Sequence, residues 1–223
     1  LVTAALIFLG MLLNFHWLLI TAPVPLDWYE GVMPLITGLL SQGENPYTLA
    51  HQPMHSNVYP PLYNLMVVPF THWFDNNLIL HRAVSGVCIV SAIVLCAHCT
   101  HRQNGKWIDA LLVAIMIYAG LLYYSTPVAS TNGTGVLFFL LSALLPWYRR
   151  FDTTGLALSI GFGLMGFFSK QYFAAGMVMV CAHLFVAVSM RTAAVYAATV
   201  LAVVATSLWW VHTSSPYYLD NVF

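Results

Sequence analysis

Residues 1–20 of the chain read LVTAALIFLGMLLNFHWLLI, a run that contains no Asp, Glu, Lys or Arg. A helix needs about 20 mostly apolar residues to cross the hydrocarbon core of a bilayer. The run has no small-residue cleavage site of the kind that ends a removable signal peptide. It therefore predicts a first membrane span or a signal-anchor.

The composition of the whole chain agrees with this interpretation. Of the 223 residues, 60% are hydrophobic and 6% are charged, and the mean hydropathy is +0.79. A soluble domain is about one quarter charged, so the composition predicts an integral membrane protein. Seven basic and seven acidic residues cancel, which argues against a basic surface for nucleic acid.

Apolar segments of membrane length, or slightly less, recur along the chain. They predict an all-α fold: a polytopic bundle of about seven transmembrane helices, forming one module over residues 1–223. The expected spans are 1–20, 78–98, 107–125, 134–148, 155–169, 171–189 and 193–212. Because the chain starts at Leu1 without methionine and ends as a polar segment opens, we expect it to be a piece of a longer protein.

One long polar segment, residues 21–77, separates the first two expected spans and holds four of the seven acidic residues. Within it, residues 61–74 are too few to cross a bilayer and predict an amphipathic helix in the membrane interface. A chain that gathers its carboxylates, turn residues and aromatics in one extramembrane segment is expected to carry its chemistry there.

The basic residues predict which face of the membrane this loop occupies. With seven spans, five of the seven basic residues fall in loops that share one face, namely 99–106, 149–154 and 190–192. Basic loops favour the cytoplasm, so the loop 21–77 is expected on the external face. Arg82 and Lys170 violate this rule together, which favours a site for an anionic group such as a lipid phosphate over snorkelling to headgroups.

Two carboxylates in the loop are candidates for catalysis. Asp27 and Glu30 follow Pro25 at the start of a helical pattern that runs to Leu40, with Pro34 predicting a kink. A spacing of three would put both carboxylates on one helix face. They could serve as a general base, hold a metal or orient an acceptor hydroxyl, or they could only stabilise the helix start. The spacing alone does not choose between these roles.

Other signatures are weak or missing. His51 and His55 are spaced as a metal pair would be on a helix, but Pro53 between them argues against a helix and favours a structural or solvated role. No nucleotide-binding signature is present. Since an external activity would also lack nucleotide sugars, a lipid-linked donor activated by phosphate is the natural substitute.

Three motifs occur in order along the loop: Glu30-Gly31, then G-x-x-P-Y at 43–47, then Y-x-P-L-Y at 59–63. This order resembles the first external loop of the GT-C superfamily of polytopic glycosyltransferases, which includes protein O-mannosyltransferases and lipid A aminoarabinose transferases. Arg82 and an F-x-S-K-Q stretch at 167–171 extend the resemblance over most of the chain. The seven-helix count is also similar to the N-terminal module of that family.

The resemblance implies an inverting transfer of a sugar from a polyprenyl-phosphate donor to the hydroxyl of a glycan, lipid or protein acceptor on the external, periplasmic face. A loop carboxylate would be the base: the register favours Glu30, with Asp27 close behind because Tyr29 stands where many relatives carry a second acid. Lys170 or Arg82 would balance the charge of the leaving lipid phosphate.

The resemblance also implies further residues and partners. The other motif residues expected to bind substrate are Gln171, Tyr47, Tyr59 and Tyr63. No cofactor is implied with certainty; a divalent metal is left open, although the second external loop lacks the acid that relatives often carry there. Membrane lipids are expected partners, nucleic acid is not, and the expected location is the bacterial inner (plasma) membrane, with a role in cell-envelope glycosylation.

Two other classes of function are weighed against this one. A transporter or flippase of lipid-linked glycan precursors would carry paired ionisable residues in mid-span or broken helices. The nearest examples lie toward span ends, which disfavours that class: His16, His98, His183 and Asp109. A non-catalytic membrane assembly subunit would tolerate the loss of both Asp27 and Glu30.

Overall fold

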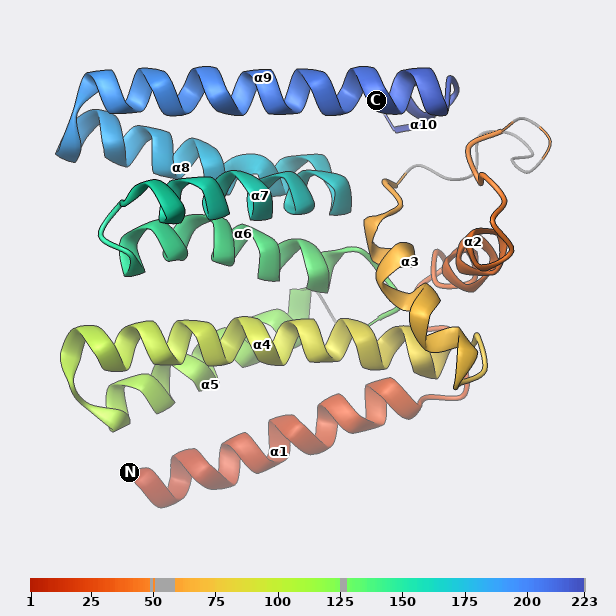
Figure 1. Cartoon of the computed structure of the whole chain (residues 1–223). Coiled ribbons are helices and arrows are strands. Elements are labelled where there is room, and N and C mark those ends of the chain that lie inside the picture. The colour runs from red at the N-terminus through yellow and green to blue at the C-terminus, as the bar shows by residue number, and fades with distance from the viewer. Residues whose placement is uncertain (49, 51–58, 125–127, 223) are drawn as a thin grey trace.

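A computed structural model describes residues 1–48, 50, 59–124 and 128–222 of the chain. These residues form helices and connecting turns, with no strand among them. The long helices lie side by side as a bundle (Figure 1). The all-α prediction is therefore confirmed.

Seven helical segments of the described chain run along the bundle and alternate in direction (Figure 1). They are α1 (Val2–Thr21), α4 (Leu78–Asn104), α5 (Trp107–Tyr124), α6 (Asn132–Tyr148), α7 (Thr153–Ser169), the composite segment Gln171–Val188 and α9 (Met190–Ser214). The composite segment consists of η3 (Gln171–Ala174), α8 (Ala175–His183) and η4 (Leu184–Val188). Each of the seven overlaps one apolar segment of the sequence.

Four of these segments are long and apolar enough to cross a membrane: α1, α4, the composite segment and α9. The helices α5, α6 and α7 are apolar but shorter. With α6 and α7 at 17 residues each, a rise of about 1.5 Å per residue gives a length of about 25 Å, slightly below the roughly 30 Å of a hydrocarbon core. Four candidate spans are thus supported by length and composition.

Small residues let the helices pack closely. A Cβ added at Gly86 on α4 would lie 2.7 Å from Nε2 of His16 on α1, so only glycine fits there. Between α6 and α7, Ser142 and Ser159 each donate a hydrogen bond to the backbone carbonyl of the other, at 2.9 and 2.8 Å. Small residues and buried hydroxyls are typical of helix contacts inside membranes.

The loops divide between the two ends of the bundle (Figure 1). One end carries the turns after α4, α6 and η4, with Arg102, Lys106, Arg149, Arg150 and Arg191 in or beside them. The opposite end, which we call the loop end, carries α2 (Val32–Ser41), α3 (Leu62–Val67), η2 (Val68–His72) and α10 (Tyr218–Val222). Charge and loop length are therefore unequally distributed between the ends.

The helix expected to start near Asp27 begins instead at Val32. Residues 26–30 form a turn, in which the Glu30 N–H donates to the Asp27 carbonyl at 3.1 Å. Pro34 consequently lies in the first turn of α2, where a missing N–H costs no intrahelical hydrogen bond, and not in a kinked interior. The prediction of both carboxylates on one helix face is wrong, because Asp27 is exposed and Glu30 is buried.

The stretch 61–74, expected to be one interfacial helix, folds as the two short helices α3 and η2. Together they run across the loop end of the bundle (Figure 1). Six α-helical and five 3-10 residues extend about 19 Å, too little to cross a bilayer. Pro69 at the start of η2 limits the continuation of α3.

Candidate functional site at the loop end

Glu30 lies at the centre of the loop end and has no exposed side-chain surface. Its Oε2 accepts hydrogen bonds from the Leu26 N–H and from Nη2 of Arg82, both at 2.6 Å. Its Oε1 accepts from the Ala129 N–H and from Nε of Arg82, both at 2.8 Å. The carboxylate therefore accepts four hydrogen bonds, two of them from a charged guanidinium.

Arg82, in the second turn of α4, is equally buried. Besides Glu30, its guanidinium donates to the Ala22 carbonyl at 2.7 Å and to the Val24 carbonyl at 2.8 Å. A buried ion pair depends on additional hydrogen bonds to its remaining donors and acceptors, and here backbone carbonyls accept two of the three N–H groups that do not bond to Glu30. The pair thus ties the segment after α1, the start of α4 and the segment before α6 into one unit.

These contacts set the charge state of Glu30. Burial by itself raises the pKa of this carboxyl, but the hydrogen bonds from Arg82, Ala129 and Leu26 outweigh it and hold the pKa below its ordinary value of 4.5. Glu30 is therefore an ionised and fully bonded carboxylate near neutral pH. In this arrangement its oxygens are not presented to solvent.

Asp27 lies on the same turn but in a different environment. Its residue is exposed, and its Oδ1 makes one long hydrogen bond, at 3.4 Å, from the Tyr29 N–H. Its backbone is held by Glu30, whose N–H donates to the Asp27 carbonyl. Of the two carboxylates predicted as bases, Asp27 is the one that can reach a bound molecule in this structure.

A polar network fixes α2 against α3 and against the turn before α4. Nδ2 of Asn64 donates to the Met33 carbonyl at 2.9 Å and to Oγ1 of Thr37 at 3.0 Å. In the turn just before α4, Nδ2 of Asn76 donates to the Pro34 carbonyl at 2.8 Å. Nothing in the spacing of Asn64 or Asn76 pointed to this role, because their partners are distant in sequence.

Tyr63, expected to bind substrate, is completely buried. Its hydroxyl donates to the backbone carbonyl of His81 at 2.8 Å. Burial raises the pKa of Tyr63 well above its ordinary value. Tyr63 therefore lies beneath the surface of the loop end, with Arg82 and Glu30, and links α3 to α4.

Lys170 lies at the loop end where α7 ends. Its Nζ donates to Oδ1 of Asn132 at 3.3 Å and lies 4.9 Å from the ring centroid of Tyr59 and 5.1 Å from that of Tyr172. Among the residues that the structure describes, no carboxylate forms an ion pair with it. Lys170 is thus a partly buried cation held by aromatic faces and one amide oxygen.

The remaining predicted residues lie near Lys170. The Tyr47 hydroxyl donates to the Tyr59 carbonyl at 2.6 Å, and Nε2 of Gln171 donates to the Val222 carbonyl at 2.5 Å. The Tyr47 ring packs edge-on against Tyr218 of α10, with centroids 4.9 Å apart. The loop between α2 and α3 and the segment after α9 therefore contact each other close to Lys170 and Gln171.

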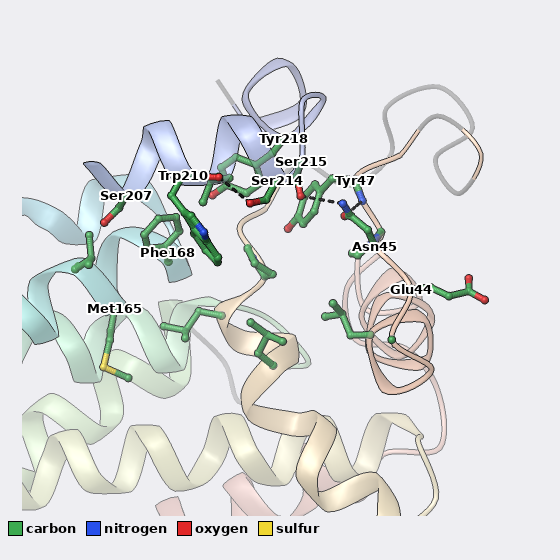
Figure 2. Close-up of a pocket in the computed structure, with 18 residues that line it drawn as sticks. Glu44, Asn45, Tyr47, Met165, Phe168, Ser207, Trp210, Ser214, Ser215 and Tyr218 are labelled. Carbon is green, nitrogen blue, oxygen red and sulfur yellow. Dashed lines mark hydrogen bonds between the residues drawn. The ribbon is translucent and has the colours of Figure 1, made fainter. Parts of the chain in front are cut away.

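An apolar cavity of about 590 Å³ opens beside these residues (Figure 2). It lies between the G-E-N-P-Y run at 43–47, α3 and the ends of α7 and α9, and its lining includes Leu62, Leu65, Met165, Phe168, Trp210 and Tyr218. The polar side chains labelled in Figure 2 include those of Glu44 and Asn45 and those of three serines at the end of α9 or just after it, Ser207, Ser214 and Ser215. Sequence reasoning missed this cavity, because its walls come from four segments far apart in the chain.

The part of the chain that the structure describes contains no group of three or more His, Cys, Asp or Glu side chains that could hold a metal ion. The histidines weighed as a metal pair, His51 and His55, lie outside the described residues.

Comparison with known proteins adds no relative: no family model matches the chain, and neither a curated protein nor a solved structure does.

Proposed function

We propose that the protein is a membrane glycosyltransferase of the GT-C type, which transfers a sugar from a polyprenyl-phosphate donor to an acceptor hydroxyl outside the cytoplasm. The observation that carries the proposal is the position of Lys170, a cation without a carboxylate partner among the described residues, close to an apolar cavity. A lipid phosphate combines the two chemistries that this arrangement would recognise.

A chain of contacts links the cation to the cavity. Lys170 lies over the Tyr59 ring, the Tyr59 carbonyl accepts a hydrogen bond from Tyr47, and Tyr47 lines the cavity. In the proposed complex, the phosphate is bound by Lys170 and the hydrocarbon chain occupies the cavity. Burial of the chain supplies affinity at roughly 25 cal/mol per Å² of apolar surface, and the cation selects the phosphate.

The proposed reaction needs one base and one site for the leaving group. The acceptor oxygen attacks the anomeric carbon and forms the new glycosidic bond, while the bond from that carbon to the phosphate oxygen breaks. The phosphate leaves with the bonding electrons and is stabilised by Lys170. The proton of the acceptor hydroxyl passes to a carboxylate.

Asp27 is the base that the geometry supports best. The carboxylate of Glu30, which the motif register favours, is occupied by four hydrogen bonds and is closed to solvent. In this proposal Glu30 and Arg82 hold the turn that presents Asp27. Arg82 takes no part in binding the phosphate in this proposal, because it is buried and four of its five N–H groups donate to Glu30, Ala22 and Val24.

The proposal includes the topology. All seven helical segments cross the bilayer, the short helices α5, α6 and α7 included, and the loop end faces the non-cytoplasmic side of a bacterial inner membrane. The five basic residues at the opposite end support this orientation. A phosphate-activated lipid donor fits that side, where nucleotide sugars are absent.

Binding of the donor can be tested without knowing the acceptor. Protein in nanodiscs is titrated with polyprenyl phosphate and with the uncharged polyprenol of equal length, and bound lipid is counted by native mass spectrometry. We expect tighter binding of the phosphate, at least a tenfold loss in Lys170→Gln, and no loss in Lys106→Gln, which removes an exposed lysine from the opposite end. Equal binding of the two lipids would contradict the proposal.

Transfer is tested on membranes supplied with radiolabelled polyprenyl-phosphate sugars. Label should pass into a non-lipid or glycolipid product with the wild-type protein. Asp27→Asn should abolish this transfer while leaving polyprenyl phosphate bound. Full activity of Asp27→Asn would exclude Asp27 as the base.

A further inference from the structure

The turn that presents Asp27 also presents Trp28, the most exposed tryptophan of the chain, with 87% of its surface accessible. The backbone around it is held on both sides, because the Leu26 N–H bonds to the Glu30 carboxylate and the Glu30 N–H bonds to the Asp27 carbonyl. Trp28 therefore projects from a fixed turn and not from a loosely held loop.

Trp28 is joined to Lys170 by a row of rings, which we call the aromatic row (Trp28, Tyr29 and Tyr59). Trp28 and Tyr29 pack edge-to-face with centroids 5.3 Å apart, and Tyr29 and Tyr59 do so at 4.7 Å. Nζ of Lys170 lies 4.9 Å from the Tyr59 centroid. The exposed indole and the cation thus lie at the two ends of one row of packed rings, whose middle ring, Tyr29, is buried.

The exposed indole of Trp28, at the loop end of an apolar helical bundle, has two chemically distinct explanations. It can lie among lipid headgroups, as tryptophans at membrane interfaces do, or it can contact a ligand. The adjacent Asp27 carboxylate is also exposed, so a ligand at this position would meet both an indole face and a negative charge. A sugar ring matches both groups, because its C–H face packs on an indole and its hydroxyls donate to a carboxylate.

We propose that Trp28 is the platform for the acceptor, on which a sugar ring of a carbohydrate acceptor stacks with one hydroxyl directed to Asp27. This inference rests on the proposed transferase function and narrows it, since it names a glycan as the acceptor in place of a protein or a simple lipid alcohol. Lys170 and the cavity then bind the donor at the other end of the aromatic row.

The control for this proposal is Trp73, which follows η2 in the same loop and is 74% exposed. Its neighbour Phe74 is also exposed. The ring contacts of Trp73 among the described residues are with His72 and do not lead to Lys170. Trp73 is therefore expected to contact lipid and not sugar.

The test uses protein labelled with 5-fluorotryptophan in nanodiscs and 19F NMR, with resonances assigned by Trp28→Phe and Trp73→Phe. Hexose and N-acetylhexosamine trisaccharides are added as probes, and nanodiscs with spin-labelled lipid report on contact with the bilayer. We expect at least one trisaccharide to shift the Trp28 resonance and not that of Trp73, with spin-labelled lipid broadening Trp73 more strongly. Absence of a sugar effect, or equal lipid broadening of both resonances, would overturn the proposal.

Variants separate this inference from the transferase function. Trp28→Ala should weaken binding of the shifting trisaccharide at least tenfold, Trp28→Tyr should retain most of it, and binding of polyprenyl phosphate should be unchanged in both. Loss of polyprenyl phosphate binding in Trp28→Ala would contradict an acceptor-specific role. Sugar binding at Trp28 without any transfer of label would reject the transferase function while leaving the carbohydrate-binding surface established.

Discussion

Arg82 and Glu30 are joined across 52 positions of sequence by two hydrogen bonds of 2.8 and 2.6 Å, and neither side chain is exposed. Paired hydrogen bonds of this kind between guanidinium and carboxylate are among the strongest in proteins. Because both groups also bond to backbone atoms of other segments, the pair is the link on which the arrangement of the loop end depends.

Removing the charge of Glu30 should destabilise the protein strongly. Glu30→Gln leaves the Arg82 guanidinium buried without a counter-charge, which costs about 3–5 kcal/mol. Asp27→Asn, at an exposed position of the same turn, should change stability by less than about 0.5 kcal/mol. Denaturant or thermal unfolding in detergent measures both, and similar effects of the two variants would contradict the role assigned to the pair.

Exchanging the two charges should not restore stability. In the double variant Glu30→Arg with Arg82→Glu, the new guanidinium would face the N–H groups of Leu26 and Ala129, and the new carboxylate would face the carbonyls of Ala22 and Val24. Donors would then face donors, and acceptors would face acceptors. We expect the double variant to be at least as unstable as Glu30→Gln; recovery to wild-type stability would show that the backbone contacts contribute little.

Lowering the pH should reduce the free energy of unfolding, because Glu30 becomes protonated. Its folded pKa lies below the ordinary value of 4.5, so the unfolded chain takes up the proton first as the pH falls. The stabilisation from the pair is therefore complete above about pH 4.5 and is lost as the pH falls through the lower folded pKa. Unfolding measured between pH 7 and pH 3 should show a steeper loss for the wild type than for Glu30→Gln, and parallel curves would contradict this.

The contact between α1 and α4 should not accept a methyl group. Gly86→Ala would bring the new Cβ to 2.7 Å from the His16 ring, whose Nδ1 is held by the Tyr118 hydroxyl at 2.6 Å. Overpacking of this kind costs about 1–3 kcal/mol. The matched control is Gly10→Ala on α1, where nothing lies within 4 Å of the added Cβ. Loss of stability of the same size in both would argue against a specific contact.

The topology can be tested by cysteine labelling. Gln42→Cys lies just after α2 at the loop end and Asn104→Cys lies at the end of α4, and both positions are exposed. In a background without the four native cysteines, a membrane-impermeant maleimide should label the two from opposite sides of sealed vesicles. Labelling of both from one side would exclude the proposed orientation.

The apolar helices were predictable because each corresponds to a continuous run of apolar residues in the sequence. The seven helical segments of the described chain all overlap the expected ranges. The start of α2 was not predictable from the same rules. Local preference placed the first helical turn at Asp27 and Glu30, whereas the buried pair between Glu30 and Arg82 keeps residues 26–30 in a turn. A long-range ion pair outweighs the few tenths of a kcal/mol that an acidic first turn contributes.

The motif residues occupy different environments in the structure. Glu30, Arg82 and Tyr63 belong to motifs and are buried in structural contacts. In contrast, Asp27 and Trp28 are exposed and Lys170 is partly buried. Asn64 and Asn76 went unnoticed, since an asparagine that bonds to a distant carbonyl has no local pattern.

The sequence by itself determined that the chain is an apolar helical protein with its charges divided between two sets of loops, because hydropathy and charge are properties of neighbouring residues. Only the tertiary structure decided which carboxylate is buried and which is exposed, and that four segments distant in the sequence line one cavity at the loop end. Burial and hydrogen bonding depend on what the folded chain brings alongside each group, and Glu30 meets Arg82 only after 52 intervening positions have folded.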